Sequence, residues 1–333
     1  MKAAAVVGAT GFVGSHIVSQ LVRCGYHVRC ASRNPEKATW LKNISEDAPE
    51  KISFYKLCLG TTGPEDDDML HNLVQGCSTL FFTAGFEKQE PATIDFMVNN
   101  ALACIFAAKK NNVESVVLTS SGGSTNAPGL TNETPKKEHT HWSDSEAQIA
   151  AGKFSPAAKT LMDLRSLEAV GRDRANNVVD KTLADSSPRL CIINPNLILG
   201  PQLQPGPISG NSLPWIGRII SGQAMTDIIP NDSMSIIDVR DLAALQVAAA
   251  EQVTSSGRYF GVDRSYPWED ILNALKKAYP SYQTPPRFKG PSSTPTQFDH
   301  SRKESLGVKL RPLHETLEDL VSFMISRGVI NAP

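Results

Sequence analysis

The chain has 333 residues, of which 41% are hydrophobic and 20% are charged, as in an ordinary globular protein. This length predicts one large domain or two moderate ones that fold without disulfides or structural metals. The 33 Lys and Arg and the 34 Asp and Glu residues give a formal net charge of −1. That balance favours neither nucleic acid nor an anionic membrane as the main partner. The composition also excludes disordered, collagen and coiled-coil proteins.

Two further observations limit the location and the chemistry. No apolar stretch approaches the roughly 18–20 residues of a membrane helix, and no signal peptide precedes the first apolar run. The six cysteines form no C-x-x-C pair, and no pair of histidines lies near them at metal-ligand spacing. We therefore expect a soluble, cytoplasmic protein without a metal site, whose partner is a small-molecule substrate.

Residues 1–120 alternate short apolar runs with amphipathic segments, which predicts a parallel sheet covered by helices on both faces. In the first amphipathic segment, Val13, Ile17 and Leu21 recur every four residues, as on one face of a helix. The predicted strands are 3–7, 27–31, 52–57, 79–83, 115–119 and 189–194, and the predicted helices are 12–24, 66–74, 99–110 and 156–174.

The pattern changes twice after this region. Residues 122–154 are rich in Gly, Pro, Asn, Thr and clustered charges, which predicts a long loop that is functional or disordered. Gly- and Pro-rich segments and a mixed region follow the strand at 189–194, and two helices, 268–278 and 313–327, are predicted near the end.

These elements predict an α/β fold, with a doubly wound parallel Rossmann sheet and a smaller, discontinuous C-terminal substrate lobe. We expect residues 1–194 to form mainly the dinucleotide-binding domain. We expect residues 195–333 to form mainly the substrate lobe, with a segment of about 236–262 that returns to the Rossmann sheet.

A glycine motif directly follows the first predicted strand. Its spacing is G-x-x-G-x-x-G: Gly8 allows the tight turn, Gly11 lets the backbone approach a pyrophosphate, and Gly14 lets helix and strand pack closely. The N-terminus of the next helix then offers free N–H groups to the phosphates. The motif therefore predicts dinucleotide binding by Gly8, Thr10, Gly11, Phe12, Val13 and Gly14.

The end of the second predicted strand bears on the choice between NAD and NADP. An acidic residue there would bind the ribose hydroxyls of NAD, but the chain has Ala31-Ser32-Arg33-Asn34-Pro35-Glu36-Lys37. Arg33 and Lys37 could hold a 2′-phosphate instead, although both are also typical solvated surface cations. We therefore predict NADP(H) as the cofactor.

The chain resembles the extended short-chain dehydrogenase/reductases, and within them the dihydroflavonol reductase and cinnamoyl-CoA reductase group. The matching pieces span nearly the whole chain: the glycine turn, Ala31–Lys37, Val117–Ser121, Trp142–Asp144, Lys159–Leu161, Ile192–Pro201, Gly257–Tyr259 and Phe288–Gly290. The resemblance implies that Ala84 and Gly85 lie beside the pyrophosphate, that Pro195 lies near the nicotinamide, and that Asn126 faces the substrate. Asn126 is also an ordinary loop-turn residue. A homodimer formed through two helices is possible, as is frequent in this superfamily.

The resemblance also implies a Ser-Tyr-Lys catalytic set, and here the chain departs from the family. Ser121 and Lys159 match the Ser and the Lys, but Ser155 stands at the tyrosine position. A phenol titrates near pKa ~10 and a neighbouring ammonium lowers that value, whereas an aliphatic hydroxyl is a far poorer acid. Ser155 followed by Pro156 also fits a helix N-cap with proline at the first helical position.

Three explanations for Ser155 stay open. The protein has lost dehydrogenase activity and kept cofactor binding, or it uses a substitute acid, or the serine is an engineered replacement. The substitute acid would be a water held by Ser155 and Lys159, or else His139 or His141 of the long loop. The function expected is an NADP(H)-dependent oxidoreductase of a carbonyl or alcohol with an atypical catalytic site. The alternatives are an impaired NADP(H)-binding sensor or complex subunit, and a nucleotide-sugar-type epimerase or dehydratase.

Overall fold

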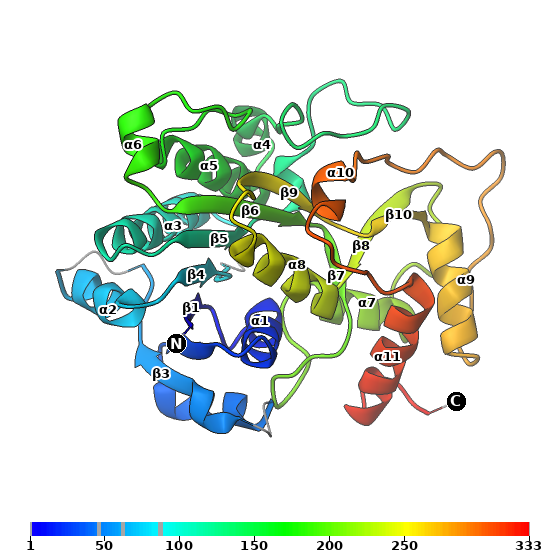
Figure 1. The fold of residues 1–333 in the computed structure, drawn as a ribbon. Coiled ribbons are helices and arrows are strands. Elements are labelled where there is room, and N and C mark those ends of the chain that lie inside the picture. The colour runs from blue at the N-terminus through cyan, green and yellow to red at the C-terminus, as the bar shows by residue number, and fades with distance from the viewer. Residues whose placement is uncertain (1, 45–47, 61–63, 86–88, 333) are drawn as a thin grey trace.

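The large sheet places the candidate site. A computed structural model describes residues 2–44, 48–60, 64–85 and 89–332, and in these ranges seven parallel strands form one sheet in the order β3-β2-β1-β4-β5-β6-β9 (Figure 1). The strands are β1 (Ala3–Val7), β2 (His27–Ser32), β3 (Ile52–Lys56), β4 (Thr79–Phe82), β5 (Ser115–Thr119), β6 (Arg189–Pro195) and β9 (Gly257–Gly261). Because all seven are parallel, their carboxyl ends share one edge, which is where doubly wound sheets bind ligands.

Helices cover both faces of this sheet, so its central strands are buried on both sides. On one face, α1 (Phe12–Arg23) packs against α8 (Val239–Glu251), and on the other α3 (Ala92–Lys110) packs against α5 (Phe154–Ala169). Figure 1 shows α1 and α8 in front of the sheet. Each layer has its own core of buried apolar side chains, and side chains alternate along β1 between the two cores.

A smaller mixed sheet forms the second lobe, in the order β10-β8-β7. β7 (Leu197–Leu199) runs parallel to β8 (Ser233–Asp238), and β10 (Arg264–Pro267) runs antiparallel to β8. The helices α7 (Ser212–Ile220), α9 (Trp268–Ala278) and α11 (Leu313–Ser326) share a third core with this sheet. The predicted α/β fold, with a doubly wound parallel sheet and a smaller lobe, is confirmed.

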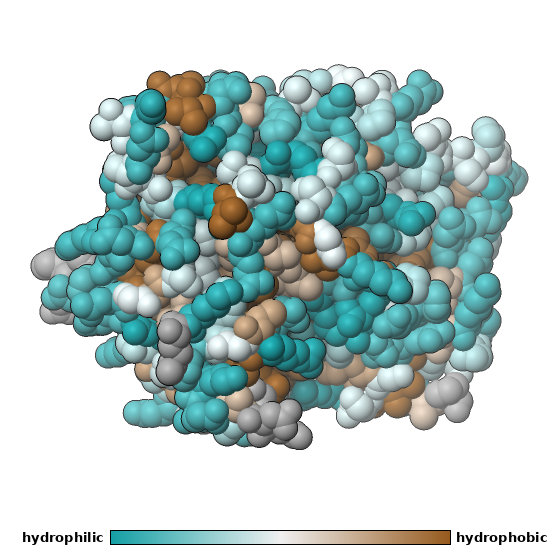
Figure 2. Space-filling view, in the orientation of Figure 1, coloured by the Kyte–Doolittle hydropathy of each residue, from teal (hydrophilic) through white to brown (hydrophobic). Residues whose placement is uncertain are grey.

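Shorter elements complete the description. They are the 3₁₀ segments at Pro35–Ile44, Pro49–Lys51 and Gly122–Ser124 and the helices α2 (Pro64–Val74), α4 (Ser145–Ala150), α6 (Lys181–Asp185) and α10 (Ser301–Glu304). None of the helices in the described ranges is long and apolar enough to cross a membrane. The face drawn in Figure 2 is mainly hydrophilic, with small separate hydrophobic areas.

The segment 122–154, which the sequence predicts as a long loop, is anchored to the rest of the molecule. It contains one 3₁₀ turn and α4, and its Lys136, Glu138 and Trp142 are buried. The backbone of Lys136 bridges to that of Phe298, far along the chain. Buried polar groups of this kind need partners, and the contacts described below supply them.

Three helix starts differ from the prediction. α2 begins at Pro64 rather than at 66, and α3 begins at Ala92 rather than at 99. α5 begins at Phe154 with Lys153 at the N-cap. The prediction that Ser155 is the N-cap is therefore wrong: Ser155 and Pro156 lie inside the first turn. Proline is tolerated there because the first N–H groups of a helix have no partner within it.

Candidate cofactor and active site

The glycine turn is built so tightly that side chains are excluded from it. Gly8 has a φ of +88°, and a Cβ on it would come within 2.7 Å of the Ala84 nitrogen and of Thr83 Oγ1. A Cβ on Gly14 would lie 2.1 Å from the Gly8 carbonyl oxygen. Thr83 Oγ1 in turn donates to the Val7 oxygen at 3.1 Å. The end of β4 therefore holds the turn in place, a role for Thr83 that the sequence analysis missed.

The middle glycine of the turn, Gly11, is the least crowded of the three. A Cβ on it would meet only the Gly8 oxygen, at 3.2 Å. Gly11 is the N-cap of α1 and provides no side-chain acceptor for the helix, so the N–H groups of the first turn, from Phe12 onward, have no partner within α1. An open backbone turn beside unpaired N–H groups fits a pyrophosphate, so these residues are compatible with a dinucleotide.

The other residues expected to bind the cofactor end at the same edge of the sheet. Arg33 and Lys37 follow β2, and both are exposed. Ala84 and Gly85 follow β4, next to the glycine turn, and a Cβ on Gly85 would meet nothing within 4 Å. Pro195 is the buried last residue of β6. The strand order thus brings together five of the predicted positions from three separate parts of the chain.

Ser121 and Lys159 meet at the carboxyl end of β5. Lys159 Nζ donates to the Thr119 oxygen at 2.7 Å, two residues before Ser121. Burial lowers the pKa of Lys159 to about 8, while the carboxylate of Asp163 opposes this shift. Ser121 Oγ accepts a hydrogen bond from the Gly123 N–H at 3.1 Å, which leaves its own proton free to donate.

Ser155 lies one turn before Lys159 on α5. Its backbone N–H donates to Gln89 Oε1 at 3.1 Å, so the segment after β4 caps the start of this helix. That Ser155 stands at the tyrosine position stays a prediction, and the chain has no tyrosine between Tyr55 and Tyr259.

The two histidines of the long loop, His139 and His141, contact Arg302 and Lys137. His139 Nε2 lies 3.4 Å from Nη1 of Arg302, whose guanidinium also donates to the Ser256 oxygen at the amino end of β9. That end is opposite to the edge that carries Ser121. His141 Nδ1 accepts from the backbone N–H of Lys137 at 2.9 Å. Among the described residues, neither ring has a hydrogen bond with Ser121, Ser155 or Lys159.

A buried polar network supports the catalytic segment. Asp163 is fully buried, and its Oδ2 accepts from Ser124 Oγ at 2.8 Å and from Asn194 Nδ2 at 2.9 Å. Asn194 Nδ2 also lies 3.3 Å from the Ser121 oxygen. The guanidinium Nε of Arg258 lies 3.6 Å from the same carboxylate oxygen. Burial raises the pKa of Asp163, and Arg258 together with these hydrogen bonds opposes that rise.

Arg258 ties this network to the 122–154 segment. Its side chain is 2% exposed and stacks 3.7 Å from the Trp142 ring centroid. Its Nη atoms donate to the backbone oxygens of Ser124, Glu138 and His141 at 3.0–3.3 Å. One buried side chain thus positions most of a segment that the sequence analysis treated as a loop.

Asn126 lines a cavity of about 400 Å³ between the 3₁₀ turn, α4 and the start of α5. Gly123 and Pro156 also line it, and a Cβ on Gly123 would lie 3.4 Å from Ser121 Oγ. The cavity therefore begins beside Ser121 and extends to Asn126. It falls within the size range of small-molecule sites.

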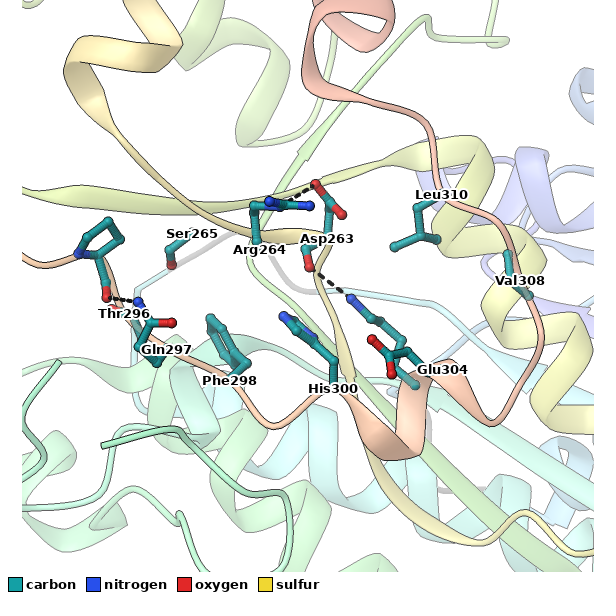
Figure 3. Close-up of a pocket in the computed structure, with 12 residues that line it drawn as sticks. Asp263, Arg264, Ser265, Thr296, Gln297, Phe298, His300, Glu304, Val308 and Leu310 are labelled. Carbon is teal, nitrogen blue, oxygen red and sulfur yellow. Dashed lines mark hydrogen bonds and ion pairs between the residues drawn. The ribbon is translucent and has the colours of Figure 1, made fainter. Parts of the chain in front are cut away.

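A larger cavity, of about 650 Å³, is lined by residues much later in the chain than Ser121 and Asn126. Its lining comes from the segments 263–265, 295–304 and 308–310, and includes Asp263, Arg264, His300 and Lys303 (Figure 3). Lys303 Nζ donates to the backbone oxygens of Val262 and Asp263, which follow β9. No candidate cofactor or catalytic residue lines either cavity. The smaller one is the candidate substrate site because Asn126 lines it and because the Cβ position of Gly123, which also lines it, is 3.4 Å from Ser121 Oγ.

Comparisons with known proteins agree with this geometry. A family model described as NAD(P)H-binding matches residues 8–152. Cinnamoyl-CoA reductase 2 of Medicago truncatula is 28% identical over 98% of this chain and 93% of its own length. A bifunctional dihydroflavonol 4-reductase/flavanone 4-reductase of Malus domestica is 25% identical over 98% of this chain and 92% of its own length. Over nearly its whole length, the chain is thus similar to reductases of the cinnamoyl-CoA and dihydroflavonol type.

Solved structures show the same fold. Vestitone reductase from alfalfa aligns with a TM-score of 0.79 and 20% identity, over 99% of this chain and 100% of its own. The yeast methylglyoxal/isovaleraldehyde reductase complexed with NADPH aligns with a TM-score of 0.79 and 21% identity, over 98% of this chain and 100% of its own. The chain therefore shares its fold, including both lobes, with those structures.

Proposed function

We propose that this protein is an NADP(H)-dependent reductase of a small carbonyl compound, with an active site that works without a tyrosine. The observation that carries the proposal is the hydrogen bond of Lys159 Nζ to the Thr119 oxygen, two residues before Ser121, at the sheet edge that also holds a glycine turn fit for a dinucleotide. The relatives support it, since those named above are reductases by name and one aligned structure contains NADPH.

The residues of the turn would hold the pyrophosphate at the N-terminus of α1. Arg33 and Lys37 would hold a 2′-phosphate, and Lys159 would hold the nicotinamide ribose. When bound, NADPH supplies the hydride. Ser121 Oγ, with its own proton free, donates to the carbonyl oxygen of the substrate and stabilises the charge that develops there.

Proton transfer to the substrate is the step that a serine at position 155 would alter. An aliphatic hydroxyl is too weak an acid to replace a phenol, so Ser155 does not itself release the proton. Lys159 lies one turn later with a pKa of about 8, and it can donate at neutral pH. We propose that a water held between Ser155 and Lys159 carries the proton to the substrate oxygen.

The test compares turnover of the wild type with Ser155→Tyr, using NADPH and a panel of aldehydes and ketones. We expect slow reduction by the wild type and an increase of about 10²–10⁴-fold in Ser155→Tyr, the usual contribution of general acid catalysis. Ser155→Ala is the matched control and measures what the aliphatic hydroxyl adds. Rapid turnover by the wild type that Ser155→Ala leaves unchanged would contradict this proton path.

A second candidate function is a non-catalytic NADP(H)-binding protein. Ser155 is the observation that favours it, because the position expected to move the proton carries no acid. Tight NADPH binding by both the wild type and Ser155→Tyr, without reduction of any carbonyl tested, would support it over the reductase. An epimerase or dehydratase would also need the missing tyrosine, so no observation favours that alternative.

A further inference from the structure

Lys136 is a buried ammonium with no counter-ion among the described residues. Its side chain is only 7% exposed, and within the described ranges its amine makes no ion pair. Burial lowers the pKa of Lys136 to about 8, so the amine is still mostly protonated at neutral pH. Burying a charge without a partner is costly, so such a group usually serves a purpose.

The backbone of Lys136 is fixed on both sides. Its N–H donates to the Gln297 oxygen at 2.9 Å, and the Asp299 N–H donates to the Lys136 oxygen at 2.8 Å. The amine lies 5.7 Å from the centroid of the Phe298 ring, which Figure 3 shows between Gln297 and His300. The amine therefore approaches Asn126 from a rigid support.

The contact between the two side chains settles how the Asn126 amide is oriented. Lys136 Nζ lies 2.6 Å from Asn126 Oδ1. An ammonium can only donate hydrogen bonds, so the amide must present its oxygen to Lys136 and turn its NH₂ group away. Asn126 lines the cavity of about 400 Å³, and no acceptor for Nδ2 is found among the described residues.

We propose that Lys136 and Asn126 form an anion-selective pair, which selects a carbonyl substrate that also carries a carboxylate. Asn126 Nδ2 donates to the carboxylate, and Lys136 fixes that amide and provides the nearby positive charge. The cavity extends from Asn126 to Gly123, beside Ser121 Oγ, so one small molecule can reach both groups. Reduction of the substrate's carbonyl group beside Ser121 rests on the proposed function. Binding of its carboxylate by Asn126 and Lys136 does not.

Binding of matched probes tests the carboxylate end without any turnover. Benzoate and benzamide have nearly the same shape and differ in charge. We expect benzoate to bind the protein about 10–100-fold more tightly by calorimetry, with and without NADP⁺, as for a charge-assisted hydrogen bond. Equal affinities in the wild type would overturn the proposal.

Two substitutions assign that preference to the pair. Lys136→Met keeps the length of the side chain and removes the charge, and we expect it to bring the benzoate/benzamide affinity ratio close to one. Lys137→Met removes the same charge from the exposed neighbouring residue, and it should leave the ratio unchanged. A lysine that only anchors the loop would weaken both probes equally, and an unchanged ratio in Lys136→Met would overturn the proposal.

Asn126→Asp is the second variant, for the case that Lys136→Met does not fold. It neutralises Lys136 within the same contact and removes the donor, so benzoate should lose its advantage while benzamide binding changes little. Turnover of 4-formylbenzoate against 4-formylbenzamide then tests the carbonyl end separately. A binding ratio that depends on Lys136, without reduction of either aldehyde, would refute the reductase and leave the pair standing.

Discussion

The glycine turn and the catalytic segment lie at the same edge of one sheet, but different interactions hold them. Backbone contacts that only glycine permits define the turn. The segment from Ser121 to Lys159 is held by side chains buried around Asp163 and Arg258. The Ser155 hydroxyl belongs to neither set, because it has no hydrogen bond among the described residues, and the backbone N–H of Ser155 donates to Gln89 Oε1. A change of the side chain at Ser155 should therefore leave both supports intact.

The largest expected effect comes from breaking the support of the catalytic segment. Asp163→Ala leaves the guanidinium of Arg258 buried without its carboxylate, and we expect a loss of about 3–5 kcal/mol in the free energy of unfolding. Denaturant unfolding measures it. The control is Glu168→Ala on the same helix, which breaks the exposed pair with Arg165 and should cost less than about 1 kcal/mol. Equal losses in the two variants would show that the network is not a special support.

A second prediction concerns the helix behind the turn. His16 Nε2 donates to the Pro201 oxygen at 2.9 Å, and burial lowers the pKa of His16 from 6.5 to about 4. The unfolded chain binds a proton between pH 4 and 6.5 that the folded chain does not. His16 therefore contributes its full stability above pH 6.5, and this is lost as the pH falls towards 4, up to about 3 kcal/mol.

The measurement is the pH dependence of unfolding from pH 4 to 7 in the wild type and in His16→Gln, which can still donate to the Pro201 oxygen. The variant should show a flatter slope over this range. His314→Gln, at an exposed position on α11, serves as the control and should keep the slope of the wild type. A slope that His16→Gln does not change would mean that the ring titrates normally.

Gly11→Val tests whether cofactor binding by the turn can be lost while the fold stays stable. Its branched side chain would point into the open space where the pyrophosphate is expected, while its nearest neighbour in the protein is the Gly8 oxygen. We expect the affinity for NADPH to fall at least about 100-fold, near 2.7 kcal/mol, with the melting temperature of the apo form almost unchanged. Calorimetry and thermal unfolding check the two halves of this prediction, and cofactor binding like that of the wild type would place the site elsewhere.

Arg33→Ala should have the smallest effect. An exposed charge-assisted contact to a 2′-phosphate is worth about 1.4 kcal/mol, so the preference for NADPH over NADH should fall about tenfold. The ratio of the two dissociation constants measures it. Arg23→Ala, an exposed arginine at the other end of α1, should leave the ratio unchanged. Equal affinity for both cofactors in the wild type would remove the basis for NADP(H).

The elements of the large sheet could be predicted from the sequence because their signals are local. The strand at Ser115–Thr119 and the helix at Trp268–Ala278 were predicted with the observed bounds. The predicted start of α5 was wrong. Ser155-Pro156 is a strong local signal for a helix cap, yet the helix already begins at Phe154. No helix was predicted at α8, because its Ala-rich sequence shows little contrast in polarity between the two helix faces.

The network and the anion-selective pair could not be predicted, because their partners are distant in the chain. Arg258 reaches Ser124 across 134 positions, and Lys136 meets a segment near Phe298. Each of these residues looks like an ordinary surface residue in the sequence. Only the fold shows that Lys136 and Arg258 are buried and which groups they face.

The place of β9 in the chain has a consequence for synthesis. β9 completes the large sheet beside β6, but it is made only after the strands β7 and β8 of the smaller lobe. Until Gly257–Gly261 leaves the ribosome, β6 is an open edge strand of apolar residues, of the kind that pairs with other chains. The nascent protein therefore carries an uncovered sheet edge from the synthesis of β6 until the chain has emerged through Gly261.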